Sequence, residues 1–452
     1  MKKMKHDVPT RLVKVLNLIL MMAAFGFVWY GYYAARAQVH YYRRGDWVVI
    51  LLFGILYYGF CRSYDAFHIS ISPISEIIYS QTLALIISDF IMYVVIWLLS
   101  LYMPNAAPLL ITFAVQFLIS ALWTFLAHQW YFHNFQPGRT AVIYDLREGM
   151  ESLVGEYGME KKFHIEKVLG VEECLVKLSV LDEMDTVFLS GIHSHERNII
   201  LKYCMYQDIQ VYVIPRIGDV IMGGAKKVHM FHLPMLRIDR YRPIPEYTIA
   251  KRAFDILFSG IAIVIASPFM LVTAIAIKSD GGPALYKQKR LTKDGKEFNV
   301  LKFRSMRVDA EKDGVARLST GDKDDRITPV GKVIRKIRFD ELPQLFNILR
   351  GDMSIVGPRP ERPEIARQYE EEMPEFRLRL QAKAGLTGYA QVYGKYNTTP
   401  YDKLLMDLTY IGTPSLWEDF KICLATVKIL FMPESTEGVS EGQTTAMSGE
   451  NH

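Results

Sequence analysis

The sequence is poor in cysteine and has little net charge. Four cysteines lie far apart in 452 residues, which excludes a dense disulfide framework and a four-cysteine zinc site. A net charge of +5 is too small to indicate a nucleic-acid-binding protein. Charged residues make up 22%, close to the average of about 25% for soluble proteins. The chain is therefore neither fibrous, nor wholly disordered, nor embedded in a membrane from end to end, and its length predicts two to four structural units.

The apolar residues are concentrated near the N-terminus. Four uncharged or nearly uncharged runs lie within residues 1–139, each long enough, or nearly so, for a hydrocarbon core of about 30 Å. We expect a four-helix transmembrane bundle with spans at about 12–35, 45–61, 81–103 and 106–127. A soluble helical core is the alternative. A cleavable signal peptide is disfavoured, because the first run lacks a small-residue cleavage site and three further runs follow.

Basic residues indicate the orientation of these helices. Five Lys and Arg residues precede the first run and favour a cytoplasmic N-terminus, so four spans return the chain to the cytoplasm near Arg139. Arg36, Arg43 and Arg44 in the first loop conflict with this topology, but they are fewer. Asp89 interrupts the third run. It is either a functional carboxylate within the membrane or, as we favour, a break between an interfacial helix and a span.

Residues 140–245 predict a small Rossmann-like α/β domain. Short strand-like runs at 141–144, 163–169, 186–189 and 210–214 alternate with helix-like stretches around 146–158, 172–182 and 195–208. The first strand–helix turn lacks the G-x-G-x-x-G pattern, so the domain is degenerate and we expect no dinucleotide site there. His193 and His195 are two residues apart, which is poor metal-ligand spacing on a helix, and we interpret them as loop residues.

A fifth apolar segment covers residues 256–277, with Ser267 and Pro268 at its centre. Proline removes a backbone donor and breaks a helix unless the freed carbonyls find other partners, such as the Ser267 hydroxyl. The spacing alone is compatible with a spanning helix or with a re-entrant helix that returns to the same face. Residues 278–312 contain ten Lys or Arg against five Asp or Glu. This basic segment suits anionic lipid headgroups or a phosphorylated substrate, and a solvated basic face is the simpler interpretation.

The densest candidate chemistry lies at residues 331–350. Two adjacent carboxylates, Asp340 and Glu341, follow Arg335, and Arg359 lies a short distance downstream. The apolar spacing predicts a helix that starts near 340, with Asp340 as its N-cap and Glu341 complementing the helix dipole. The alternative is functional, because carboxylates, fixed cations and a helix N-terminus together can hold a metal-bound phosphate.

Several separated motifs occur here in one order. They are Lys251-Arg252-x-x-Asp255, Ser267-Pro268, Leu301-Lys302-Phe303-Arg304-Ser305-Met306, Asp340-Glu341-Leu342, Gly351-Asp352-Met353-Ser354, Val356-Gly357-Pro358-Arg359-Pro360, Gly385-Leu386-Thr387-Gly388 with Ala390-Gln391-Val392, and Asp407. From about 249 to 431 the chain resembles the bacterial sugar transferases, which are monotopic polyprenyl-phosphate phosphoglycosyl transferases. Four spans and a degenerate α/β domain ahead of this module are similar to the long form of that family.

The resemblance implies a reaction and a set of site residues. Asp340 would be the nucleophile that takes a phosphosugar from a UDP-sugar, with Glu341 as its Mg²⁺-associated partner, and both carboxylates would face the metal. Arg335 and Arg359 match family arginines that handle phosphates and the nucleotide, and Ser267-Pro268 would break a re-entrant helix at 252–278. We expect further substrate contacts from Pro358, Pro360, Lys302, Arg304 and Gln391, which lie in the same motifs.

The implied partners are a UDP-sugar, undecaprenyl phosphate, membrane lipids and a second copy of the chain. The implied reaction starts the synthesis of an exopolysaccharide, capsule or other glycoconjugate and releases UMP. The implied location is the bacterial inner or plasma membrane, with a mostly helical catalytic module at 246–433 on the cytoplasmic face and a disordered tail at 434–452. Ala384, Tyr389 and Tyr393 depart from the usual family residues, and this leaves the sugar open.

Two other functions compete with this one. The chain could be a catalytically silent membrane scaffold of polysaccharide assembly, against which the intact Asp340, Glu341, Arg335 and Arg359 speak. It could also be a metal-dependent lipid phosphatase in which water replaces the lipid acceptor. Release of UMP without any dependence on lipid would favour the phosphatase.

Overall fold

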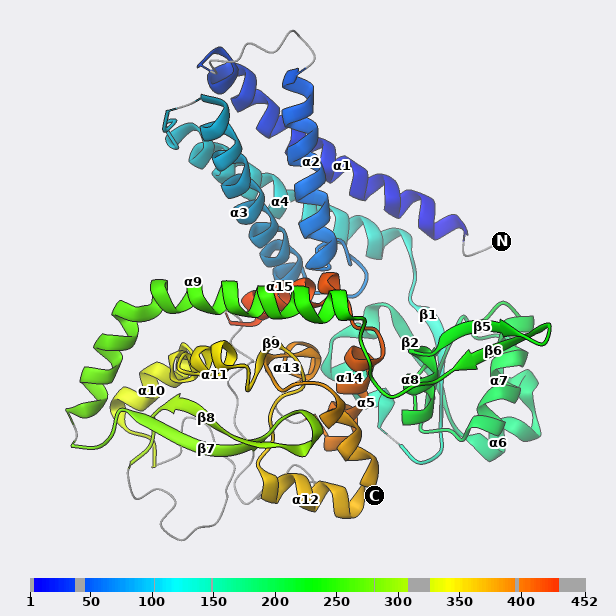
Figure 1. Cartoon of the computed structure of the whole chain (residues 1–452). Coiled ribbons are helices and arrows are strands. Elements are labelled where there is room, and N and C mark those ends of the chain that lie inside the picture. Colours follow the sequence, from blue (N-terminus) through cyan, green and yellow to red (C-terminus); the bar gives the residue numbers. More distant parts are fainter. Residues whose placement is uncertain are drawn as a thin grey trace. The chain divides into compact units, whose positions relative to one another are not determined.

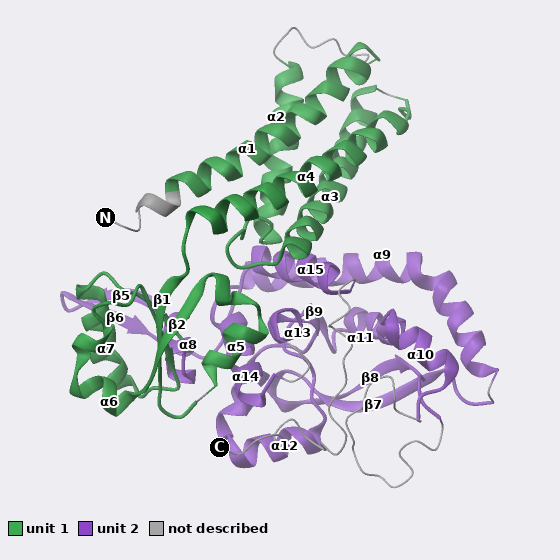
Figure 2. Cartoon of the chain, turned by 180° about the vertical axis from the view of Figure 1, so that it is seen from behind, with its two compact units in different colours: residues 1–214 green, residues 215–452 purple. Residues whose placement is uncertain are grey.

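The computed structural model describes residues 4–36, 45–100, 102–147, 149–279, 281–307, 326–394 and 398–430. The expected disordered tail at 434–452 and the loop residues Arg43 and Arg44 lie outside this part of the chain. The chain divides into two compact units, residues 1–214 and 215–452, which Figure 2 shows in green and purple.

The first unit begins with four long apolar helices, as the hydropathy pattern predicted. They are α1 (Met4–Val28, continued by short turns to Arg36), α2 (Gly45–Ser63), α3 (Ile74–Ser100) and α4 (Ala107–Asn134). Each is long and apolar enough to cross a membrane. The prediction that Asp89 marks a break was wrong, because α3 runs through Asp89 without interruption. The helix contains no proline or glycine, and a carboxylate side chain removes no backbone hydrogen bond.

Polar side chains join the helices inside this bundle. The Tyr57 hydroxyl donates to Asn17 Oδ1 at 2.9 Å, and the Ser120 hydroxyl donates to Gln81 Oε1 at 2.6 Å. Asn17 Nδ2 in turn donates to the same Gln81 oxygen at 3.4 Å. All four helices therefore contribute to one buried polar cluster, and interhelical hydrogen bonds of this kind stabilise helix association in lipid.

A parallel four-stranded sheet follows the bundle in the same unit. Its strands are β1 (Gly138–Tyr144), β2 (Phe163–Gly170), β3 (Thr186–Ser190) and β4 (Gln210–Val213), in the order β2-β1-β3-β4. All three strand pairs are parallel, so the predicted α/β sheet is confirmed. The connecting turns and helices include α5 (Met150–Glu156), η3 (Met159–Lys161), α6 (Val171–Val176), η4 (Leu178–Leu181) and α7 (Ser194–Tyr206).

Alternate residues of β1 feed two separate apolar cores. Ala141 and Ile143 pack with residues of α6 and α7, whereas Val142 packs with Val154 of α5. This is the pattern of a sheet covered on both faces. The interpretation of His195 as a loop residue was wrong, because His195 lies in the first turn of α7, which begins at Ser194.

The second unit is mostly helical. After α8 (Ile217–Gly223) and the hairpin β5–β6 (Lys226–Met230 and Leu233–Arg237), it contains α9 (Pro245–Lys278), a second hairpin β7–β8 (Leu285–Leu291 and Glu297–Phe303, joined by η5, Lys293–Gly295), α10 (Pro329–Lys336), η7 (Phe339–Glu341), α11 (Gln344–Arg350), β9 (Ser354–Val356), α12 (Pro363–Glu372), η8 (Pro374–Gln381), β10 (Gly385–Thr387), α13 (Tyr389–Tyr393), α14 (Pro400–Gly412) and α15 (Leu416–Leu430). Strands β9 and β10 pair in parallel.

Helix α9 is long, bent and largely exposed. It has 34 residues with Pro268 inside, and Figure 1 shows it bending part-way along its length. Pro268 cannot donate to the carbonyl of Val264, which lies four residues earlier. The Ser267 hydroxyl donates to that carbonyl instead, at 2.8 Å. The freed carbonyl is therefore satisfied within the helix, as we expected of a break that lipid can tolerate.

The N-terminal half of α9 is fixed to the rest of its unit by charged residues. Arg252 donates to the carbonyls of Ile348 and Leu349 at the end of α11, at 2.6 and 2.7 Å. Buried Asp255 accepts from the backbone N–H of Ile355 at 2.9 Å and from the hydroxyl of Ser354 at 3.1 Å. The Lys251-Arg252-x-x-Asp255 motif thus anchors a mostly exposed apolar helix to the polar module behind it.

Candidate functional site

The two adjacent carboxylates lie in a tight turn and not at the start of a helix. Asp340 and Glu341 belong to the 3₁₀ turn η7, which follows Arg338 in the left-handed region at φ 56°. Helix α11 begins only at Gln344, directly after Pro343, and no side chain caps it. The prediction that Asp340 is an N-cap was therefore wrong. The apolar spacing correctly located α11, but the preceding residues turn too tightly to continue it.

Glu341 lies between two cations. Its Oε1 accepts hydrogen bonds from Nζ of Lys302 at 2.8 Å and from Nη2 of Arg359 at 3.4 Å. Burial by itself raises the pKa of Glu341, but Lys302 and Arg359 outweigh burial and hold the pKa well below its usual range. Glu341 is therefore a permanent negative charge that keeps two cations at one place.

Asp340 has different surroundings. Burial raises the pKa of Asp340, the charge of Lys302 opposes this rise, the charge of Glu341 adds to it and Arg335 opposes it. Among the described residues, Nη1 of Arg335 is buried and has no hydrogen-bond partner. A buried guanidinium nitrogen without an acceptor is costly to the protein alone and is suited to a bound anion.

Four of the predicted residues line one pocket. Lys302, Glu341, Arg359 and Pro360 meet there, and the other lining residues are Arg290, Val300, Gln344, Gly385 and Leu386. Three cations and one carboxylate thus face the same space. A pocket with this balance of charge favours a ligand with several negative charges, such as a diphosphate.

The other predicted residues, Asp340 among them, do not line this pocket. Arg304 is buried and donates to the carbonyls of Pro283 and Ile277, at 2.9 and 3.0 Å, so it holds the end of α9. The Pro358 carbonyl accepts from the Gly385 N–H at 2.9 Å, which joins two motif loops. Gln391 is in α13, and its Nε2 is 3.5 Å from the Leu386 carbonyl. Arg335 is in α10 near Asp340.

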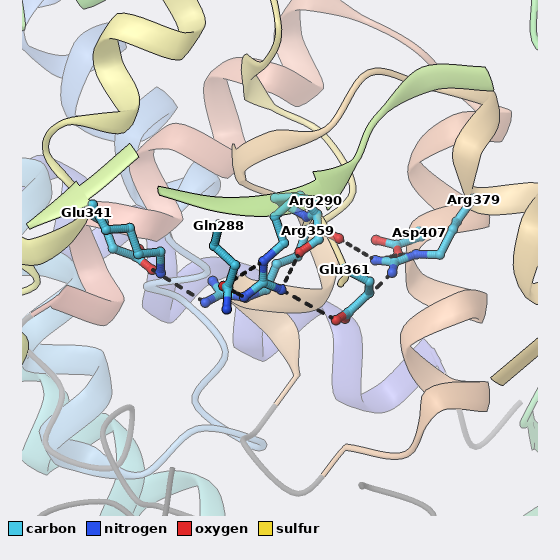
Figure 3. A network of polar contacts seen from close by, with 9 residues as sticks. Gln288, Arg290, Glu341, Arg359, Glu361, Arg379 and Asp407 are labelled. Atoms are coloured by element: carbon cyan, nitrogen blue, oxygen red, sulfur yellow. Dashed lines mark hydrogen bonds and ion pairs between the residues drawn. The ribbon is translucent and has the colours of Figure 1, made fainter. Parts of the chain in front are cut away.

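Several charged residues beside the pocket were not predicted from the sequence. Arg290 of β7 lines it, and a network of ion pairs connects Arg290 through Glu361 to Arg379 (Figure 3). Arg290 belongs to the basic segment 278–312, which was noted as a whole, but nothing in its spacing distinguishes it from its neighbours. Arg379 belongs to none of the motifs, and only its burial next to Asp407 marks it.

Asp340 and Glu341 are the carboxylates that the resemblance assigns to Mg²⁺. Among the described residues, no group of three or more His, Cys, Asp or Glu side chains is arranged to hold a metal ion. Mg²⁺ in phosphate-transfer sites is commonly held by one or two carboxylates together with substrate phosphates and water. Asp340 and Glu341 provide such a pair, and Glu341 stays ionised. The residues therefore fit Mg²⁺ that arrives with a diphosphate substrate.

Comparison with known proteins identifies relatives of the second unit. Residues 246–433 match the model of the family described as "Bacterial sugar transferase". The chain is 40% identical over 201 residues to the UDP-glucose:undecaprenyl-phosphate glucose-1-phosphate transferase of Caulobacter vibrioides, a match that covers 43% of this chain and 74% of that protein.

Two further relatives carry other sugars in their names. The UDP-N-acetylgalactosamine-undecaprenyl-phosphate N-acetylgalactosaminephosphotransferase of Aeromonas hydrophila is 40% identical, over 51% of this chain and 54% of that protein. The undecaprenyl-phosphate galactose phosphotransferase of Salmonella typhimurium is 38% identical, over 49% of each chain. The chain thus spans about half the length of these two curated relatives.

Proposed function

Because the chain belongs to the bacterial sugar transferase family, we propose that it transfers a sugar-1-phosphate from a UDP-sugar to undecaprenyl phosphate. In this proposal it catalyses the initiating step of the synthesis of a polysaccharide or related glycoconjugate. The single observation that carries the proposal is the placement of Glu341 between Lys302 and Arg359, in a pocket beside Asp340.

The first step is the attack of Asp340 on the UDP-sugar. A carboxylate oxygen of Asp340 forms a bond to the phosphorus that carries the sugar, and the bond from that phosphorus to the oxygen of UMP breaks. UMP leaves with the electron pair, and an acyl-phosphate joins the phosphosugar to the enzyme. Lys302 and Arg359, held by Glu341, offset the negative charge of the diphosphate.

The second step transfers the phosphosugar to the lipid. A phosphate oxygen of undecaprenyl phosphate attacks the same phosphorus, and the carboxylate of Asp340 leaves unchanged. Each step replaces one phosphoanhydride or acyl-phosphate by another, so the free energy changes little and the reaction runs in both directions.

Asp340 and Glu341 would hold Mg²⁺ together with the diphosphate. When bound, the ion supplies positive charge that lets an anionic nucleophile approach an anionic substrate. The protein's own contribution is separate, since Glu341 keeps Lys302 and Arg359 in the pocket in the absence of any ligand.

We further propose that α9 is re-entrant and that the second unit lies on the cytoplasmic face of the bacterial cell membrane. The bend of α9 and the Ser267-Pro268 pair within the helix support a return to one face, and the exposed apolar side chains of α9 support its insertion into lipid. This arrangement would keep Asp340 at the membrane surface, where the phosphate of the lipid acceptor lies.

The test is UMP release by the purified full-length protein in detergent. A panel of UDP-glucose, UDP-galactose and their N-acetylated forms is offered with and without undecaprenyl phosphate, because the relatives' names include three different sugars. We expect one or two UDP-sugars to release UMP in multiple turnovers only when the lipid is present. Equal turnover without lipid would instead indicate a phosphatase, and no UMP release from any sugar would favour a silent scaffold.

A further inference from the structure

The loop that carries Arg359 can be held in place mainly through its carbonyl groups. Pro358 and Pro360 lie on either side of Arg359, and neither has a backbone N–H. The loop connects β9 to α12 and belongs to neither. Because two of its backbone N–H groups are missing, the loop cannot form a regular ladder of backbone hydrogen bonds. Its conformation therefore depends on hydrogen-bond donors that other elements supply to its carbonyls.

Four consecutive carbonyls in this loop each accept a hydrogen bond from a different residue. The Pro358 carbonyl accepts from the N–H of Gly385, and the Glu361 carbonyl accepts from the N–H of Leu291 at 3.0 Å. The two carbonyls between them accept from guanidinium groups. Arg379 Nη2 donates to the Arg359 carbonyl at 2.9 Å, and Arg290 Nη1 donates to the Pro360 carbonyl at 3.0 Å.

These two guanidinium groups lie beside acidic side chains, buried Asp407 and half-buried Glu361. Arg379 is 3% exposed, and its Nε and Nη2 lie 2.8 and 2.7 Å from Oδ2 of Asp407, whose side chain is 1% exposed. Glu361 lies between the two arginines, 3.6 Å from Arg379 and 3.9 Å from Arg290 (Figure 3). An arginine fixed by two contacts to one carboxylate has a defined plane, so its remaining N–H group points in one direction.

The position of the Arg359 side chain depends on these backbone contacts. This side chain is 45% exposed, lines the pocket and lies 3.4 Å from Glu341. An exposed arginine has many rotamers, and its contact with Glu341 therefore depends on where its backbone is held. The backbone carbonyl of the same residue is the group that Arg379 binds.

We propose that Arg379 and Asp407 are positioning residues, which hold the Arg359 loop so that the Arg359 guanidinium reaches Glu341 and the phosphates of the substrate. The proposal rests on the proposed function for its kinetic readout, but the loop geometry that it invokes is independent of the substrate. Neither residue lines the pocket, and both act through Arg359.

A double-mutant cycle separates positioning from general stabilisation. Asp407→Asn should lower kcat/KM for UMP release by about 100-fold, the loss typical of a small misplacement of a catalytic group. In an Arg359→Lys background, whose side chain lacks the planar fork, Asp407→Asn should lower kcat/KM by less than about threefold more. Full multiplication of the two losses would overturn the proposal, because Asp407 would then act independently of Arg359.

Leu404→Ala is the matched control. Leu404 is fully buried on the same helix α14, in the core cluster that packs beside Asp407, and it contacts none of the loop carbonyls described above. The cavity lowers the melting temperature without disturbing the loop. We expect Leu404→Ala to keep kcat/KM within about threefold of the wild type at a temperature where both are folded. An activity loss equal to that of Asp407→Asn would mean that destabilisation alone explains the effect.

Hydrogen exchange provides a readout that needs no turnover. The amide of Gly357, which donates to the Thr387 carbonyl, and the amides of Leu291 and Gly385, which donate to the loop, should exchange at least tenfold faster in Asp407→Asn than in the wild type, and at the wild-type rate in Leu404→Ala. Arg379→Lys, which keeps the charge but loses the planar fork, is the second variant and should also exchange faster. Unchanged loop exchange in both Asp407→Asn and Arg379→Lys would overturn the proposal, even if the wild type released no UMP and the proposed function failed.

Discussion

Adjacent carboxylates with opposite surroundings define the site at the scale of single residues. Glu341 accepts from two cations, which keep its pKa low, whereas burial raises the pKa of Asp340. A carboxylate that is already paired is a poor nucleophile, because attack would require it to leave its partners. Asp340 is therefore the better candidate for covalent chemistry, and Glu341 is the better candidate for organising positive charge.

The first prediction separates these two roles. Asp340→Asn should leave the melting temperature within a few degrees of the wild type and lower turnover by about 1,000-fold or more, because an amide cannot form the acyl-phosphate. Intact mass spectrometry should find one phosphosugar on the wild type incubated with a UDP-sugar alone, and none on the Asn variant. Substantial turnover by Asp340→Asn would move the search for the nucleophile to Glu341 or Asp352.

Glu341→Gln should impair turnover for another reason. The amide removes the charge that holds Lys302 and Arg359, so both cations lose their shared partner. We expect the half-maximal rate to require a higher Mg²⁺ concentration, together with a loss of maximal rate, measured as UMP release across a magnesium titration. Wild-type kinetics in this variant would contradict the role of Glu341 on which the proposed function rests.

Arg335 should favour substrate binding and lower the stability of the protein without substrate. Its Nη1 is buried without a partner among the described residues, so Arg335→Met should raise the free energy of unfolding by about 1 kcal/mol. The same variant should lower kcat/KM by at least tenfold. Lys336→Met, an exposed neighbour on α10, is the control for the loss of a charge and should change neither quantity. A destabilised Arg335→Met would show that this guanidinium has a structural partner.

At the scale of elements, α9 is anchored near both ends and carries a proline and many exposed apolar side chains between them. Lys251 bonds to Asp419 at 2.9 Å, and Arg252 and Asp255 bond to α11 and β9. Beyond these contacts the helix is apolar and contains Pro268, whose missing bond the Ser267 hydroxyl replaces. The charged residues thus determine where α9 is attached, and the Ser-Pro pair determines where it turns.

Pro268→Ala should straighten α9 and disable the enzyme. With an otherwise native sequence, cysteines introduced at residue 145 and at the exposed position 289 should both react with a reagent from the cytoplasmic side. In Pro268→Ala, labelling at 289 should become mixed and UMP release should fall several-fold, because the lipid phosphate and Asp340 would no longer be aligned. Gly260→Ala, at a position of α9 with open space around it, should alter neither property. Labelling of residue 289 from outside, without Pro268→Ala, would contradict the re-entrant proposal.

Asp255→Ala tests the anchor by itself. It leaves the N–H of Ile355 and the hydroxyl of Ser354 without their buried acceptor, which should lower the free energy of unfolding by about 1–3 kcal/mol. Thermal melts in detergent provide the measurement. Asp255→Asn keeps one acceptor oxygen and should be less destabilised than Asp255→Ala. Equal stability of the Ala variant and the wild type would mean that water or another group satisfies β9.

At the scale of the whole molecule, the match to the sugar transferase family covers residues 246–433, whereas the second compact unit begins at Pro215. The extra residues include α8, whose Ile217 and Val220 pack with the core that contains α14. Gly224 and Gly412 also approach so closely that a Cβ on Gly224 would lie 2.7 Å from the Gly412 backbone. The residues before the family match therefore cover part of its core.

A chain that starts at Pro215 should fold and retain some UMP release in detergent, if this unit carries all the chemistry. A chain that starts at residue 241 lacks α8 and should melt at a lower temperature, because Ile217 and Val220 no longer cover the core beside α14. Both measurements use the same detergent and the same UDP-sugar. Complete inactivity of a folded chain from Pro215 would mean that the first unit contributes to the reaction.

Hydrophobic patterns determined the elements that lie in uniform surroundings. Four long apolar runs predicted α1 to α4, and short β-branched runs predicted β1 to β4 within a few residues. Burial of an entire segment requires apolar side chains at most of its positions, so the pattern is visible in the sequence. The motif order likewise marked Asp340, Glu341, Arg335 and Arg359 as candidate site residues. It could not show that Asp340 lies in a turn, because the competition between a 3₁₀ turn and a helix start is decided by the packing of neighbouring segments.

Only the tertiary structure brought the pocket and its support together. Lys302, Glu341 and Arg359 come from three separate motifs and meet at one carboxylate. Arg290, Arg379 and Asp407 are up to 117 positions apart and act on adjacent carbonyls of one loop or on each other. The charge of a side chain follows from the sequence, but its partner depends on the distance between segments of the chain. That distance is fixed only when the apolar cores between the segments have packed.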